Sequence, residues 1–167
     1  RFVYVIDVHY LMDTSKGIPY ENLTPGYDKI LHSGLAGLKY PDSEVANEYC
    51  KSHNHVLEQM AMLADRIIEK LEGCSFDWMK RLKDCPAEHF EEAIQRMLFV
   101  NQMLWQTDHR LTGLGAWDTY LYPFYEKDLA EGYLDREGVR EILRDLYRTL
   151  HDYYEYKSNI LMGDTGQ

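Results

Sequence analysis

The sequence lacks several features that would indicate its function directly. It contains no run of eighteen apolar residues, which a membrane-spanning helix requires. It contains no GxGxxG fingerprint, P-loop, nucleophile elbow or HExxH metal motif. The chain begins at Arg1 without an initiator methionine, a charged leader or a cleavage site, so we expect no signal peptide. Local motifs alone therefore indicate no activity.

Cysteine is scarce, and basic residues are outnumbered by acidic ones. The three cysteines, Cys50, Cys74 and Cys85, are odd in number and have no CxxC spacing, which favours a reduced, cytoplasmic protein. The formal net charge of -10 argues against nucleic acid and anionic membranes as partners, because both require clustered Lys and Arg. The acidic residues are dispersed, so we expect a solvated surface that includes Glu91-Glu92 and the run from Tyr125 to Asp128.

The periodicity of the apolar residues predicts a mainly helical chain in one domain. Thr24 and Pro25 are suited to begin a helix as N-cap and first helical residue. Its apolar stripe includes Gly34, which indicates a close backbone approach by a neighbouring element. That stripe consists of Tyr27, Ile30, Leu31, Gly34, Leu35 and Leu38.

The longest predicted helix begins with Asp42 or Ser43 as its cap and ends just before Gly73. Its twenty-nine positions correspond to a rod of roughly 44 Å, which suits the outer wall of a larger body. The apolar stripe of this helix consists of Val45, Tyr49, Val56, Met60, Leu63, Ile67 and Leu71.

Three further helices are predicted: a short one over 76–83, one opened by Pro86, and a strong final one capped by Asp135. An aromatic-rich segment over 116–129 follows the glycines of the Gly113–Gly115 break. We predict one strand over 2–10 and the start of another within 158–167. The apolar stripes are Phe90, Ala93, Ile94, Met97, Leu98, Asn101, Leu104 and Trp105, then Val139, Ile142, Leu143, Leu146, Leu150 and Tyr154.

Seven histidines raise the question of a metal or a catalytic base. His53 and His55 would lie about 200° apart on a helix, so they do not share one ion. His109 follows a helix, but no nucleophile lies near it in the sequence, and a surface position is the more ordinary interpretation. His9, at the end of the first predicted strand, is better placed to reach a pocket, although a structural histidine bonded to backbone is the alternative. We predict no metal site and no catalytic residue.

The long-range pattern is more specific. Residues 85–95 (CPAEHFEEAIQ) resemble a P-A-x-T-F-x-E-A-L-Q helix start, and residues 113–129 (GLGAWDTYLYPFYEKDL) resemble a G-L-G-R-x-D-Q-Y-L-Y-P-Y-Y-x-x-D block. Upstream, residues 26–35 are similar to a D-Y-x-x-x-L-x-x-G-L helix. Downstream, residues 158–167 resemble a stretch that leads into a strand. These motifs belong to the glycyl radical enzymes of the pyruvate formate-lyase type. The chain departs from the block at Ala116 and Thr119, where the family has arginine and glutamine.

The resemblance implies a mainly α-helical fragment with one or two short strands, which in the parent family forms part of an α/β ten-stranded barrel. Residues 1–167 would be a single partial domain, the front half of the pyruvate formate-lyase-like domain. The parent enzyme would carry a glycyl radical, installed by an activating enzyme that uses S-adenosylmethionine and an iron–sulfur cluster, and would pass it to a cysteine. The R-V-x-G-[YFW] radical motif is absent from this sequence, and none of its cysteines has the required surroundings.

The resemblance also implies a role and partners for this chain. It would supply scaffold and part of the substrate pocket of an anaerobic, cytoplasmic lyase, dehydratase or acyltransferase, with His9 as the substrate-binding candidate. It would bind no cofactor itself, and its partners would be the rest of the parent chain, the activating enzyme and further copies in a homo-oligomer. One alternative is a stand-alone, non-catalytic helical interaction module derived from this fold. Another is a complete small enzyme that uses His9 or His109.

Overall fold

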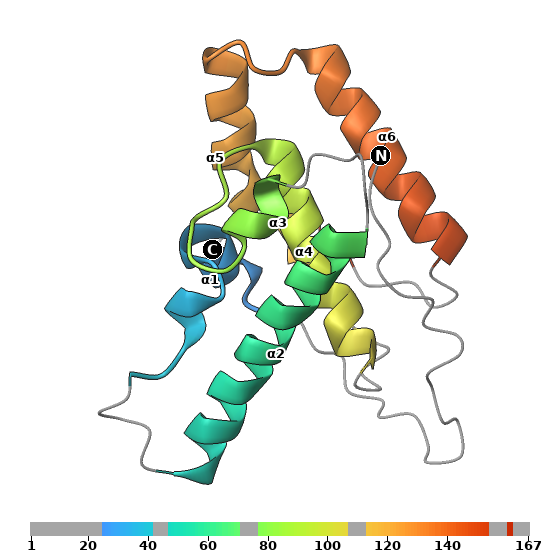
Figure 1. Cartoon of the computed structure of the whole chain (residues 1–167). Coiled ribbons are helices and arrows are strands. Elements are labelled where there is room, and N and C mark those ends of the chain that lie inside the picture. Colours follow the sequence, from blue (N-terminus) through green and yellow to red (C-terminus); the bar gives the residue numbers. More distant parts are fainter. Residues whose placement is uncertain (1–24, 42–46, 71–76, 107–112, 154–159, 162–167) are drawn as a thin grey trace. The chain divides into compact units, whose positions relative to one another are not determined.

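The computed structural model describes residues 25–41, 47–70, 77–106, 113–153 and 160–161, which are predominantly helical (Figure 1). The predicted strand over 2–10, with His9, lies outside these ranges. By its internal contacts the chain divides into two compact units: Arg1–Tyr27 with Glu88–Gln167, and Asp28–Ala87. A single partial domain over 1–167 stays a prediction. None of the described helices is long and apolar enough to cross a membrane.

The Asp28–Ala87 unit begins with most of α1 (Tyr27–Ser33). The predicted start at Pro25 is two residues early, because α1 starts at Tyr27, and the predicted apolar stripe continues past the end of α1, which stops before Gly34. Gly34 has a φ of 65°, the left-handed conformation that ends a helix, and residues 36–38 form a separate 3-10 helix, η3 (Ala36–Leu38). The predicted close approach is confirmed: a Cβ on Gly34 would lie 2.9 Å from the carbonyl oxygen of Leu82.

Helix α2 (Glu48–Lys70) is the longest helix described, and its 23 residues span about 35 Å. It begins later than predicted, because Asn47 Oδ1 accepts the Cys50 N–H at 2.8 Å and caps it in place of Asp42 or Ser43. Its buried face was predicted correctly at Ile67 but wrongly at Tyr49 and Val56, which are 67% and 56% exposed. The buried residues are Cys50, Leu57, Ala64 and Ile67.

The short helix α3 (Asp77–Arg81) completes this unit, as the sequence predicted. The loop after α3 returns to α1 and η3 through backbone hydrogen bonds. Leu35 N–H donates to Leu82 O at 2.9 Å, and Ala87 N–H donates to Leu31 O at 2.7 Å. The absence of a side chain at Gly34 allows the two backbones to lie this close.

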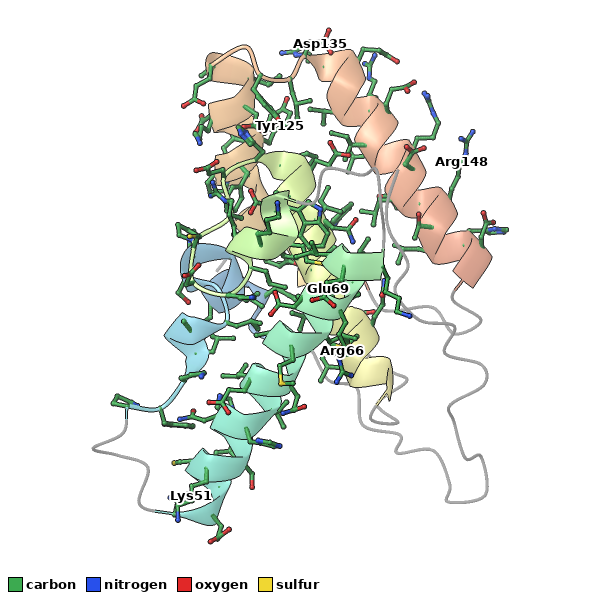
Figure 2. The ribbon with its side chains drawn as sticks, viewed as in Figure 1. Lys51, Arg66, Glu69, Tyr125, Asp135 and Arg148 are labelled. Carbon is green, nitrogen blue, oxygen red and sulfur yellow. The ribbon has the colours of Figure 1, made fainter. Side chains whose placement is uncertain are left out.

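The other unit contains three long helices: α4 (Phe90–Gln106), α5 (Trp117–Ala130) and α6 (Arg136–Tyr153). The predicted stripe of α4 is confirmed from Phe90 to Asn101, since Phe90, Ala93, Ile94, Met97, Leu98 and Asn101 are all buried, whereas Leu104 is half-buried. The predicted cap of α6 is also confirmed: Asp135 Oδ1 accepts the Gly138 N–H at 2.7 Å. Figure 2 shows Asp135 at the N-terminal end of α6.

Two short strands belong to the same unit. Strand β1 (Gly115–Ala116) pairs in parallel with β2 (Ile160–Leu161), in the register Gly115–Ile160 and Ala116–Leu161. The strand predicted within 158–167 is therefore confirmed at residues 160–161. Strand β1 was not predicted, because Gly115 was interpreted only as part of a helix break. Helices α5 and α6 lie between the strands in the chain, so the connection is a helical crossover of the kind that parallel strands require.

Candidate functional site

The most organised polar cluster in the described residues surrounds the strand turn, which we define as Gly113–Ala116. Tyr27 at the start of α1 donates its hydroxyl hydrogen to Gly113 O at 3.3 Å. Asn101 on α4 in turn donates through Nδ2 to the Tyr27 hydroxyl at 3.0 Å. Both side chains are buried, and Tyr27 lies 86 positions from Gly113, so residues distant in sequence fix the start of this turn.

Tyr120, on the first turns of α5, supports the same segment from the other direction. Its hydroxyl donates to Leu114 O at 2.6 Å, and its ring lies 6.0 Å from that of Tyr27. Gly115 follows with a φ of 64°, which few residues other than glycine adopt easily. Gly115 is the first residue of β1, and α5 follows directly after Ala116. This network therefore sets where β1 begins.

A second polar cluster holds the start of α4. Asp128 is fully buried on α5 and accepts two hydrogen bonds, from Phe90 N–H at 2.7 Å on Oδ2 and from His89 Nδ1 at 2.8 Å on Oδ1. The Asp128 carboxylate thus caps α4 from another helix. The His89 ring stacks on Tyr133, with centroids 3.6 Å apart and planes 10° apart. The interpretation of Asp128 as solvated surface is wrong.

Glu92 and Arg96 form a buried ion pair one turn further along α4. Arg96 Nη2 lies 2.5 Å from Glu92 Oε1, and the two side chains are 0% and 8% exposed. The other oxygen, Glu92 Oε2, accepts the Glu88 N–H at 2.9 Å, which helps to cap the same helix. Glu92 is therefore not the solvated residue that its sequence context predicted. The only sequence signal that Glu92 is a buried structural residue was its alignment with the glutamate of the P-A-x-T-F-x-E-A-L-Q motif.

The described ranges contain no group of three or more His, Cys, Asp or Glu side chains that could hold a metal ion. His53 Nε2 lies 3.0 Å from Leu38 O, while the neighbouring His55 is exposed. His9, His109 and Cys74 lie outside the described residues. The buried polar side chains of these clusters bond to backbone groups and to one another.

The Asp28–Ala87 unit also has a cavity of about 450 Å³ between η3 and α2, lined in part by Leu57, Met62 and Lys39. At its rim, Lys39 Nζ donates to Glu58 Oε1 at 2.9 Å. This hydrogen bond and the lysine charge lower the pKa of the Glu58 carboxyl. A Lys83–Asp65 pair lies in the same unit.

Comparison with known proteins identifies the class. A similar fold is found in a solved structure from a study of 1,2-propanediol dehydration in Roseburia inulinivorans. The two chains superpose with a TM-score of 0.62 and 24% identity, over 88% of this chain and 24% of the other. At that identity the likeness shows the fold.

The family described as "Pyruvate formate lyase-like" matches residues 7–161. The chain therefore belongs to the pyruvate formate-lyase-like glycyl radical enzymes, and the predicted resemblance is confirmed.

Two curated relatives are similar over shorter stretches. Isethionate sulfite-lyase from Nitratidesulfovibrio vulgaris is 35% identical over 72 residues, which is 42% of this chain and 9% of that protein. Indoleacetate decarboxylase from Tractidigestivibacter scatoligenes is 33% identical over 98 residues, which is 56% of this chain and 11% of that protein. The matched stretches thus cover about a tenth of the length of these relatives.

Proposed function

We propose that this chain is the scaffold portion of a glycyl radical lyase or dehydratase, and that it is not catalytic alone. The observation that carries the proposal is the parallel pair of β1 and β2. Each strand has only two residues, and parallel sheets are ordinarily broad and covered on both faces. A pair this short is better suited to continue into a larger sheet than to stand alone.

The proposed larger sheet is the ten-stranded barrel of the parent enzyme. In this barrel, β1 and β2 would be neighbouring strands, and α5 and α6 would pack against the outside of the barrel. The polar network of Tyr27, Asn101 and Tyr120 supports this assignment, because it fixes the start of β1 from the helices. Part of the substrate pocket wall would come from the N-terminal segment, with His9 as the proposed contact.

The chemistry of the proposed enzyme requires groups that this sequence does not contain. A glycyl radical, installed by an activating enzyme that uses S-adenosylmethionine and an iron–sulfur cluster, would supply the oxidising equivalent through a cysteine thiol. The residues of this chain would bind and orient parts of the barrel and exclude water, which protects a radical from side reactions. Such an enzyme would work anaerobically in the cytoplasm, as a homo-oligomer, on a small organic substrate.

A stand-alone helical module is the second candidate. It is favoured by the well-packed interior of the described residues, in which 24 hydrophobic side chains are buried. A module should be monodisperse and should unfold cooperatively, whereas a scaffold portion should associate or unfold at low temperature, because exposed apolar side chains and strand edges favour association.

The test compares the 167-residue chain with the complete reading frame of its source. Each protein is incubated anaerobically with the activating enzyme and examined by electron paramagnetic resonance, size-exclusion chromatography and thermal denaturation. We expect the radical signal only from the complete protein, and a chain that associates or melts non-cooperatively when alone. A source frame without a radical glycine, together with a monomeric and cooperative 167-residue chain, would establish the module instead.

A further inference from the structure

Helix α2 carries an apolar stripe beside the one that it buries. Figure 1 shows α2 as one uninterrupted helix. Along it, positions at alternating spacings of four and three residues carry five apolar side chains and a histidine over about 27 Å. This alternation is typical of a helix face that packs against another helix. The stripe, which we call the α2 seam, consists of Tyr49, His53, Val56, Met60, Leu63 and Ile67.

Most of the α2 seam is uncovered in the described part of its unit. Tyr49 and Val56 are 67% and 56% exposed, Ile67 is buried, and the other three members are half-buried. The stripe that α2 does bury lies one position further along the chain, and therefore about 100° around the helix. It consists of Cys50, Leu57 and Ala64. Helix α2 thus has two apolar faces, and the described residues cover only one of them fully.

Tyr49 is held in place although it is exposed. Its ring stacks on His53 at a centroid distance of 6.2 Å and meets the Tyr40 ring edge-on at the same distance. His53 Nε2 in turn lies 3.0 Å from Leu38 O. The Asn54 side-chain amide fixes Tyr40, because it accepts from the Tyr40 N–H at 2.8 Å and donates to the Tyr40 carbonyl at 2.9 Å. An aromatic side chain that is ordered beforehand loses little entropy on binding, so this end of the α2 seam is preorganised for a partner.

The border of the α2 seam limits what can cover it. On the side away from the buried stripe lie polar, exposed residues, each one position before a seam residue: Ser52, Gln59 and Arg66. The uncovered strip is therefore narrow along its whole length. A β-sheet presents neighbouring strands about 4.8 Å apart and would also cover this polar border. A single helix covers a strip of this width, and its side chains interdigitate with the alternating spacing.

We propose that the α2 seam is the docking site for one helix from the remainder of the parent chain, outside residues 1–167. This inference rests on the proposed function, in which this chain is one portion of a larger enzyme. The similar solved chain contains enough additional sequence to supply such a helix, because this chain covers only 24% of it. A second copy of this chain is a poorer occupant, since two bodies with a formal net charge of -10 each repel one another. Because Ile67 is already buried, the incoming helix would extend the core of the unit along α2.

The first experiment is hydroxyl-radical footprinting of the complete protein encoded by the source, before activation. Mass spectrometry gives the oxidation rate of each residue relative to its rate in the urea-unfolded protein. We expect Tyr49 to be protected as strongly as the buried Tyr27, within about twofold, because the centre of an interface excludes solvent. Met62 is the control, since it is 48% exposed on another side of α2 and should be oxidised readily. Unprotected Tyr49, or equal protection of Met62, would overturn the proposal.

A photo-crosslinking amino acid in the complete protein then identifies the occupant. In place of Val56, it should crosslink to residues outside 1–167 that lie about three or four positions apart, as on a helix face. In place of Met62, the same amino acid should give no such crosslink. No crosslink from position 56, crosslinks to residues 1–167 of a second copy, or crosslinks to alternate residues of a strand would each contradict the proposal.

Electron paramagnetic resonance of the activated complete protein tests the proposed function separately. A radical signal without protection of Tyr49 would overturn only the docking site. Protection of Tyr49 without a radical signal would overturn only the proposed chemistry and would leave the docked helix in place.

Discussion

The carboxylate of Asp128 on α5 lies 2.8 Å from Nδ1 of His89, a residue 39 positions earlier that precedes α4. The second oxygen of the same carboxylate accepts the Phe90 N–H, so one buried side chain ties the two helices together. The distance in sequence makes this contact a tertiary one, and α4 depends on it for its N-terminal cap.

Replacing Asp128 with alanine should destabilise the unit that contains α4 and α5. The change removes a helix cap and leaves the buried Phe90 N–H without its acceptor, which together should lower the free energy of unfolding by about 2–4 kcal/mol. Asp128→Asn keeps an acceptor oxygen and should cost less. Urea denaturation followed by circular dichroism measures both, with exposed Glu131→Ala as the control. Equal stability of Asp128→Ala and wild type would contradict the capping role.

Gly34→Ala should be far more damaging than Gly132→Ala. Both glycines have a positive φ, 65° and 69°, so alanine at either position carries the same backbone strain of about 1–2 kcal/mol. Only at Gly34 does the added Cβ also meet backbone, 2.9 Å from Leu82 O, whereas nothing lies within 4 Å at Gly132. The difference between the two melting temperatures therefore isolates the close approach. Matching losses would show that strain alone accounts for both.

The buried pair of Glu92 and Arg96 should behave as a unit. Arg96→Met leaves a buried carboxylate without its cation and should cost about 3–5 kcal/mol, as for other broken buried ion pairs. Adding Glu92→Gln removes the stranded charge while keeping an acceptor for the Glu88 N–H, so the double variant should be more stable than Arg96→Met alone. A double-mutant cycle from denaturant unfolding measures this coupling. Additive losses would mean that the two side chains act independently.

Glu58 should titrate below its ordinary pKa of 4.5, because Lys39 donates a hydrogen bond to it and adds a nearby positive charge. A carboxyl whose pKa is lowered by folding adds stability above its ordinary pKa, and this stability is lost as the pH falls through the lowered value. Carbon-detected NMR titration should show the pKa of Glu58 rising toward 4.5 in Lys39→Met. A Glu58 titration curve that is the same in Lys39→Met and in wild type would contradict this cause.

Sequence reasoning succeeded where local chemistry decides the structure. The cap at Asp135 and the buried stripe from Phe90 to Asn101 were predicted, because an N-cap and a helical period are local signals. The wrong face of α2 shows the limit of such reasoning. Apolar residues occur on more than one side of that helix, and the structure buries Cys50, Leu57 and Ala64 together with the predicted Ile67, leaving Tyr49 and Val56 exposed.

The candidate site was harder to predict, because its residues act over long sequence separations. Composition placed Glu92 and Asp128 on the surface, since most carboxylates are solvated. Their buried partners, Arg96 in one case and the backbone of Phe90 in the other, are evident only in three dimensions. Glu92 and Asp128 both match acidic positions of the two family motifs, so the family resemblance marked these two carboxylates where the charge pattern did not.

Because β1 has only two residues, its pairing register with β2 must be determined by contacts outside the strand. Gly115 and Ala116 form too short a ladder to choose a register by side-chain alternation, which normally prevents slippage. The register is instead determined by the Tyr27 and Tyr120 hydroxyls, which donate hydrogen bonds to the carbonyl oxygens of Gly113 and Leu114 just before the strand. A substitution on the first turn of α1 can therefore shift a strand that it never touches.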